Sequence, residues 1–212
     1  MKILLSSNGS FFYENFYDIF NIHIKDVKLA FITTASKGVS NKEYMEKHIL
    51  KMKELGFDFT EIDIDYKNEE ELETSLKDFN FIYVAGGSSF YLLKSIKKSG
   101  FDKVVKKLVT QGVVYIGSSA GAYVASPSID ISVWKDEYRK EKRNRYGLVD
   151  FNAMGLVDFL VLAHYEEGLK EIIKKNLLNS KYLLRILRDG QALLIDDDKI
   201  SFIGEGEEEI IN

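Results

Sequence analysis

The first 117 residues alternate between short runs of β-branched and aromatic residues and longer segments with helical spacing. This order is typical of an α/β fold, a mostly parallel sheet with helices on both faces. Ligands of such sheets bind outside the carboxyl ends of the strands, so functional residues are expected in the loops that follow the runs. The runs predicted to be buried strands are residues 2–6, 28–33, 57–64, 79–84 and 113–117.

Four helices are predicted between these strands. Gly56 comes directly after one of the helical segments, and Gly100 and Gly112 come shortly after two others. Glycine is common just past a helix C-terminus because it adopts positive φ without strain. The predicted helices cover residues 42–55, about 69–76, 90–98 and 102–110.

The pattern changes after Gly121. Residues 127–148 are polar, and we expect them to be irregular. Residues 132–148 are expected to fold over a site as a covering segment. A further helix is predicted at about 168–178. The last two apolar runs, 192–195 and 199–203, are separated by three aspartates and predict an antiparallel hairpin at the edge of the parallel sheet.

Length and composition limit the class of protein. With 212 residues the chain is long enough for one core, and we expect a single domain over residues 1–212. No apolar run reaches the roughly 18 residues that a membrane span needs, and the N-terminal apolar block is too short for a secretory signal. The chain has no cysteine, hence no disulfide and no thiolate metal site. We expect a cytoplasmic protein with no membrane partner, no metal and no cofactor.

The net charge of −4 argues against nucleic acid as a partner. The densest basic stretch, residues 139–145, could bind phosphate, but acidic Glu141 interrupts it and Asp136 and Glu137 precede it. A solvated loop is therefore the favoured interpretation. The sequence leaves a homodimer open.

One pentamer carries the strongest chemical signal. The predicted strand ending at Ile116 runs directly into Gly-Ser-Ser-Ala-Gly, residues 117–121, and a helical segment follows. This is the nucleophile-elbow pattern in the context that it requires. Small residues two before and two after Ser119 avoid collisions at a sharp turn, and the N–H of Ala120 could stabilise an oxyanion. A tight turn without catalysis is the alternative. Ser118 lacks the glycine two positions before it, so Ser119 is the predicted nucleophile.

A second glycine-rich loop follows the strand that ends at Val84. Gly86 and Gly87 let backbone N–H groups turn inward at the carboxyl edge of the sheet, where they could complete an oxyanion hole. A phosphate-binding nest is the competing interpretation, although the Lys-Ser/Thr pair of a P-loop is missing. A plain helix-entry turn is the structural alternative.

A serine nucleophile needs a base, and the chain offers three histidines. His48 falls on the apolar face of a predicted helix, and His23 lies far upstream. His164 follows an apolar strand and is the predicted base. The orienting carboxylate is less constrained: Asp189 lies in a turn between two strands and is preferred. Its rivals are Asp130, Asp136, Asp158 and Glu166.

These motifs resemble peptidase family S51, which includes peptidase E (aspartyl dipeptidase) and cyanophycinase. The resemblance rests on residues 86–93, 115–122, 155–159 and 164–165, and it spans nearly the whole chain. It implies a flavodoxin-like fold akin to class I glutamine amidotransferases, with serine in place of their cysteine. It also implies Ser119 as nucleophile, His164 as base, an acid at Asp189, and hydrolysis of short peptides such as dipeptides with N-terminal Asp.

Two positions depart from the family pattern. Ser88 stands where the family often has a third glycine; its N–H is retained, so we expect it to stay available at the oxyanion site and Ser88 to contact the substrate. The segment after the histidine, residues 165–170, is short and lacks the arginine of aspartate-preferring members. Lys170 is the residue there that could offer a point charge to a substrate carboxylate.

Two other functions compete with a serine peptidase. An α/β-hydrolase esterase is one, although its acid precedes the histidine in the chain, whereas Asp189 follows His164. The other is a non-catalytic, amidotransferase-like binding protein that keeps the elbow as a structural relic.

Overall fold

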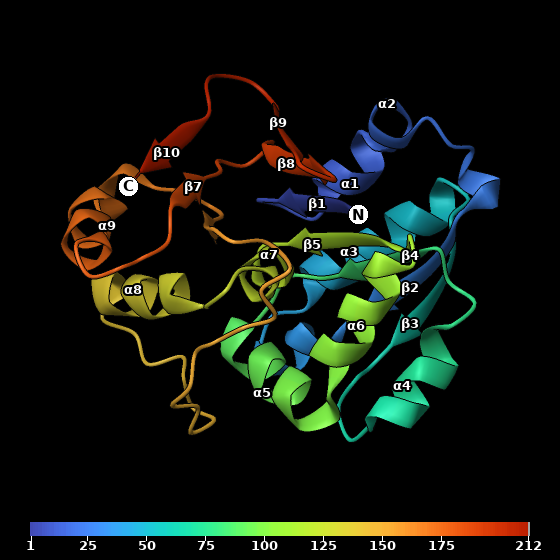
Figure 1. Cartoon of the computed structure of the whole chain (residues 1–212), viewed down its shortest axis with the longest axis horizontal. Helices are drawn as coiled ribbons and strands as arrows, with labels where there is room; N and C mark the ends of the chain where they lie inside the picture. Colours follow the sequence, from blue (N-terminus) through green and yellow to red (C-terminus); the bar gives the residue numbers. More distant parts are fainter. Residues whose placement is uncertain (212) are drawn as a thin grey trace.

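The computed structural model describes residues 1–211 and contains two sheets (Figure 1). The larger has seven strands in the order β3-β2-β4-β5-β1-β8-β9, and the smaller has the order β10-β7-β6. Five adjacent strands of the large sheet are parallel, which confirms the predicted α/β class. Their bounds are β1 (Lys2–Ser6), β2 (Lys28–Ile32), β3 (Asp58–Ile62), β4 (Phe81–Val84) and β5 (Val114–Ser118).

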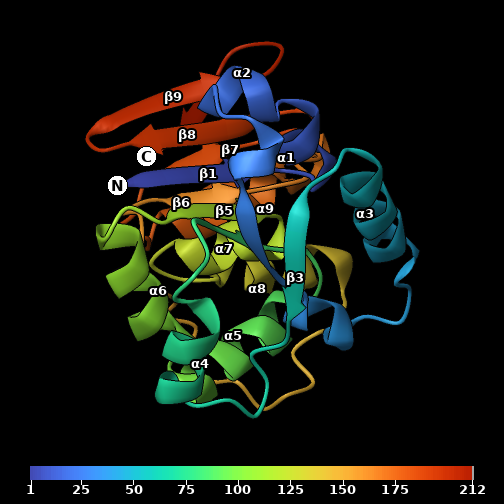
Figure 2. The ribbon, with the colours of Figure 1, turned by 90° about the vertical axis from the view of Figure 1, so that its right-hand side faces the viewer.

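Helices cover both faces of this sheet (Figure 2). The chain moves outward from β1 to β2 and β3, then returns through β4 to β5. Because parallel crossovers are right-handed, the two directions place their helices on opposite faces. One face carries α1 (Ser10–Glu14), α2 (Phe16–Phe20) and α3 (Glu43–Glu54); the other carries α4 (Glu69–Leu76), α5 (Ser89–Ser99), α6 (Phe101–Thr110) and α7 (Ala120–Ala125). Short 3₁₀ turns lie at η1 (Ile24–Asp26) and η2 (Thr34–Gly38).

The predicted hairpin is present at one edge of the large sheet. Strands β8 (Ala192–Asp196) and β9 (Lys199–Ile203) pair antiparallel with each other, and β8 pairs antiparallel with β1. The N-terminal strand is therefore enclosed between β5 and β8. This arrangement brings the first and last parts of the chain side by side.

Helices α1 and α2 were missing from the sequence prediction. Phe12, Phe16 and Phe20 recur at intervals of four residues and pack in one aromatic cluster against Phe81 of the sheet. The spacing is helical, but neither helix has a side-chain cap. Their stability comes from tertiary burial, which outweighs weak local propensity.

The prediction that residues 127–148 are irregular is wrong over α8 (Asp130–Arg139). Ile131, Trp134 and Lys135 are buried at i, i+3 and i+4, the spacing of one helix face. The charges obscured this pattern in the sequence, because a lysine, Lys135, belongs to the buried face of the helix. Residues 140–148 that follow it have no regular structure apart from a bend.

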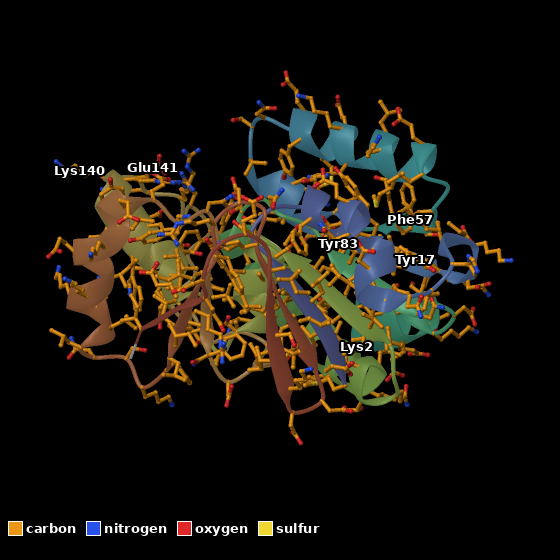
Figure 3. The ribbon with its side chains drawn as sticks, turned by 90° about the horizontal axis from the view of Figure 1, so that it is seen from above. Lys2, Tyr17, Phe57, Tyr83, Lys140 and Glu141 are labelled. Atoms are coloured by element: carbon orange, nitrogen blue, oxygen red, sulfur yellow. The ribbon has the colours of Figure 1, made fainter. Side chains whose placement is uncertain are left out.

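The small sheet and two helices form a lobe beside the large sheet (Figure 1). It is built from β6 (Leu160–Leu162), β7 (Leu184–Ile186), β10 (Glu209–Ile211), the turn η3 (Glu167–Leu169), and α8 with α9 (Lys170–Leu177). Lys140 and Glu141 lie at its outer tip, at the opposite end of the molecule from Tyr17 and Phe57 (Figure 3).

Strands β1, β4 and β5 end at the same edge of the sheet because they run parallel and adjacent. The loops that follow them start at Ser7, Ala85 and Ser119, and they converge there.

Within residues 1–211, no helix is both long enough and apolar enough to cross a membrane.

Candidate active site

Ser119 occupies a sharply bent turn between β5 and α7, with φ 50° and ψ −108°. A non-glycine residue rarely adopts this conformation, and such strain concentrates at functional sites. The two flanking glycines permit the turn: a Cβ on Gly117 would lie 2.5 Å from the Gly121 carbonyl oxygen, and one on Gly121 would lie 2.1 Å from that of Val84. The pentamer therefore forms a nucleophile elbow.

The two serines of the elbow have different surroundings. Ser118 is 1% exposed, and its Oγ lies 3.1 Å from the hydroxyl of Tyr83. Ser119 is half-buried and lines two cavities, while its N–H donates to the Ser6 carbonyl. Ser118 lines the smaller cavity alone, whereas Ser119 lines both cavities and is the more exposed of the two serines.

The Gly86–Gly87 loop lies directly beside the elbow. A Cβ on Gly86 would lie 3.3 Å from Ser119 Cβ, so glycine permits this close approach. Gly87 has φ 142°, and a Cβ there would lie 2.4 Å from the Ala35 carbonyl oxygen. Within residues 1–211, the backbone N–H groups of Gly87 and Ala120 have no hydrogen-bond acceptor, so both are available to an oxyanion.

Ser88 lines the larger cavity, but its N–H is already used. It donates to the Ala35 carbonyl over 3.0 Å, and Ser88 Oγ caps α5 by accepting from the N–H of Tyr91. The expectation that the Ser88 N–H stays available at the oxyanion site is therefore wrong.

His164 lies at the end of β6 and is hydrogen-bonded to Asp189. Its Nδ1–H donates to Asp189 Oδ1 over 2.6 Å, which leaves Nε2 as the nitrogen available to a hydroxyl. His164, like Ser119, has positive φ, at 52°. Its side chain lines both cavities together with Ser119, although within residues 1–211 no hydrogen bond joins the two residues. Such contacts are often long in enzymes without substrate.

Ser7 was not predicted, yet it connects two of these residues. Its Oγ accepts from the backbone N–H of His164 and donates to Asp189 Oδ1, each over 2.8 Å. It follows β1 directly, at the carboxyl edge of the sheet. That position was a usable signal, because functional residues are expected in the loops at this edge of the sheet.

The other candidate acids have different partners. Glu166 pairs with Arg139, and Asp136 accepts from the backbone N–H of Arg143. Asp130 begins α8, and Asp158 is exposed. Of the five acids, Asp189 is the one that the structure joins to His164.

A second histidine lies near the nucleophile. His48 of α3 lines a cavity of about 320 Å³ together with Tyr44, Gly87, Ser119 and His164. Its Nδ1 lies 2.9 Å from the hydroxyl of Tyr13, and burial lowers its pKa. No carboxylate bonds to it within residues 1–211, so its imidazole lacks the partner that His164 has. His23 is exposed and remote from both cavities.

The larger cavity, about 410 Å³, lies on the other side of Ser119 and His164 and is rich in basic side chains. Among its lining residues Asp136 is the one carboxylate, against four cationic residues. Those four come from α8 and the segment after it, where the sequence predicted a solvated loop: Lys135, Arg139, Arg143 and Arg145.

Lys135 is the buried member of this basic group, at 7% exposure. Its Nζ donates to the Ala163 carbonyl and to the hydroxyl of Tyr123, both neutral groups. Burial lowers its pKa to about 8, because the ammonium loses hydration without gaining a paired carboxylate. The cavity wall therefore holds a cation suited to an anionic ligand.

Lys170 begins α9, is exposed, and does not line either cavity. The structure thus places the predicted point charge away from the nucleophile. Within residues 1–211, no group of three or more His, Asp or Glu side chains is arranged to hold a metal ion.

Comparisons with known proteins relate the chain to peptidases. The sequence model of peptidase family S51 matches residues 3–203. An uncharacterized peptidase of Listeria innocua is 30% identical, covering 85% of this chain and 86% of its own, and peptidase E of a Nostoc species is 26% identical over 96% and 86%. A crystal structure of a candidate peptidase E from Listeria monocytogenes superposes with a TM-score of 0.82 at 26% identity, covering 97% and 98%.

A peptidase structure from an acI-B1 actinobacterium shares the fold, with a TM-score of 0.67 at 17% identity and coverage of 99% and 93%. The family resemblance and the α/β fold expected from the sequence are confirmed. The chain belongs to peptidase family S51 and is a serine-type peptidase.

Proposed function

We propose that this enzyme hydrolyses short peptides, dipeptides among them, through an acyl-enzyme on Ser119. His164 Nε2 takes the proton from Ser119 Oγ as the oxygen attacks the scissile carbonyl carbon. The N–H groups of Gly87 and Ala120 hold the resulting oxyanion. The C–N bond then breaks as His164 donates the proton to the leaving amine, and water hydrolyses the ester in the same way.

The hydrogen bond between His164 Nδ1–H and Asp189 carries this assignment. It selects the tautomer whose Nε2 can accept a proton, and it stabilises the imidazolium that forms. The bond from Ser7 to Asp189 holds the carboxylate in place. The elbow supports the nucleophile's role, because it directs Ser119 toward the cavities that His164 also lines.

The basic side chains that line the larger cavity support a substrate that carries a carboxylate. We assign aspartate at the N-terminus of the substrate as the preferred residue. Arg139 and Arg143 are paired with carboxylates and Arg145 is exposed, whereas the buried Lys135 has only neutral partners among residues 1–211. A substrate carboxylate would therefore supply the anion that Lys135 lacks. This role differs from the sequence expectation, which gave it to Lys170.

A labelling and substrate screen tests the proposal. A fluorophosphonate should label the purified enzyme at Ser119, as read by peptide mass spectrometry. Among Asp-Leu, Asn-Leu, Leu-Leu and Asp-Leu-amide, the first should have the highest kcat/KM. If Asp-Leu and Asn-Leu were hydrolysed at equal rates and Asp-Leu-amide were not hydrolysed, the carboxylate that the enzyme binds would be the one at the C-terminus of the substrate. An enzyme that is neither labelled nor active on any peptide would refute the proposal.

Replacement of Lys135 by Met should selectively weaken acidic substrates. Because a charge-assisted hydrogen bond contributes about 1.5–3 kcal/mol, KM for Asp-Leu should rise roughly 10- to 100-fold. KM for Asn-Leu should change less than about threefold. In the unchanged enzyme, KM for Asp-Leu should also rise as the pH passes about 8, where Lys135 loses its proton. Asn-Leu corrects for titration of the substrate amine, and steady-state kinetics from pH 6 to 9.5 gives both values.

Two variants are the controls for this test. Lys106 is exposed on α6, far from the cavities, and Lys106→Met should leave both KM values unchanged. Lys170→Met compares the two candidate anchors directly. Selective loss of Asp-Leu hydrolysis in Lys170→Met, with Lys135→Met unaffected, would return the anchor to the residue predicted from sequence.

A further inference from the structure

Tyr44 of α3 contacts the glycine loop from the side opposite to the larger cavity. Its hydroxyl donates to the Gly86 carbonyl oxygen over 3.0 Å. The ring is half-buried among the aromatic side chains beneath α3, and its edge contacts the ring of His48. Burial raises the pKa of the Tyr44 phenol, so the hydroxyl remains a protonated donor throughout the physiological pH range.

The Gly86 carbonyl and the Gly87 N–H belong to one peptide plane. In a trans peptide these two groups point in opposite directions. A hydrogen bond that holds the carbonyl toward Tyr44 therefore directs the N–H of Gly87 away from α3. The close approach of Gly86 to Ser119 puts this plane beside the nucleophile, and the N–H has no acceptor within residues 1–211.

Two glycines in succession leave this peptide unusually free to rotate, because neither carries a Cβ. The chain after it is fixed, since the Ser88 N–H donates to the Ala35 carbonyl and a Cβ on Gly87 would collide there. The chain before it is fixed by the bond from the Ala85 N–H to the Ile32 carbonyl. Tyr44 thus supplies the side-chain contact that selects the orientation of the peptide between these two anchors.

We infer that Tyr44 is a positioning residue: through the Gly86 carbonyl it sets the orientation of the peptide whose N–H forms half of the oxyanion hole. The inference rests on the proposed function. Tyr44 itself acts through the loop and needs no contact with the substrate.

Tyr44→Phe tests the inference, because it removes one oxygen and keeps the packed ring. We expect kcat for Asp-Leu to fall about tenfold, while KM stays within about twofold, since the oxyanion forms only during reaction. The rate of fluorophosphonate labelling at Ser119 should fall similarly. A crystal structure of the variant should show the Gly86–Gly87 peptide rotated or in two orientations.

Tyr13→Phe is the matched control. It makes the same chemical change on a tyrosine whose hydroxyl contacts His48 on the same face, without touching the glycine loop. Its kcat should stay within twofold of the original value, and thermal unfolding should show both variants folded. An unrotated peptide with unchanged kcat in Tyr44→Phe would overturn the inference, and so would a rise in KM alone.

The crystallographic readout separates this inference from the proposed function. If the unchanged enzyme hydrolysed no peptide and escaped labelling, the proposed function would fail. The loop orientation in Tyr44→Phe would still decide whether Tyr44 controls the peptide. Conversely, if the unchanged enzyme is active but Tyr44→Phe alters neither the loop orientation nor kcat, the positioning role is refuted and the peptidase mechanism still stands.

Discussion

Replacing Ser119 by Ala should lower kcat/KM for peptides by about 10⁴-fold or more and leave the fold intact. The hydroxyl forms the covalent bond in the proposed mechanism, and removing a nucleophile of this kind eliminates most of the catalysis that depends on its base. The residual rate would come from the oxyanion hole and substrate binding. Activity assays and fluorophosphonate labelling measure the loss.

The fold should survive this change for a local reason. Ser119 is half-buried, and within residues 1–211 its Oγ forms no hydrogen bond that the alanine variant would lose. The melting temperature should therefore change by no more than about 2 °C. Ser118→Ala is the comparison, since it removes a buried bond to Tyr83. Undiminished turnover in Ser119→Ala would contradict the assigned nucleophile.

His164→Ala should produce a loss of comparable size, about 10³- to 10⁴-fold in kcat, because Ser119 then lacks a base. His48→Ala is the informative partner, since both imidazoles line the smaller cavity with Ser119. Only His164 bonds to a carboxylate, so His48→Ala should retain activity within about tenfold. Parallel kcat measurements on the folded variants decide between the histidines; the reverse ranking would exchange their roles.

Asp189 should contribute less than the two residues that exchange the proton. Its side chain is 66% exposed and that of His164 is 39% exposed, so water competes for the same hydrogen bond. Ser7 partly compensates by holding the carboxylate from the other side. This arrangement makes orientation of the imidazole the main contribution of the acid.

The parts of the fold that depend on local sequence were predictable. Helix α4 has the predicted bounds, and Asn68 and Glu71 form a capping box at its start. The elbow was recognisable because the glycines at 117 and 121 flank Ser119 within one strand–turn–helix unit, although the contact that requires glycine at 121 comes from Val84 of the neighbouring strand β4. The same holds for the hairpin of β8 and β9, whose strands are neighbours in the chain.

The parts of the fold that depend on contacts between distant segments were not predictable from the sequence. Strand β6 pairs with β7, which also pairs with β10, and no local pattern specifies that small sheet. Helix α8 was obscured by the charges that interrupt its apolar positions, so its basic side chains were not connected with the cavity. Ser7 gained its role only through contacts 157 and 182 residues along the chain.

The enclosure of β1 between β5 and β8 has a consequence for synthesis of the protein. Strand β1 is translated before both of its neighbours, and β8 comes long after β5 in the sequence. Ser7 likewise bonds to Asp189, which lies 182 residues later in the sequence. A nascent polypeptide that ends before Asp189 therefore lacks the acid that we propose for the proton relay of Ser119 and His164. In the proposed mechanism, the relay is complete only after the segment leading into β8 has been synthesised.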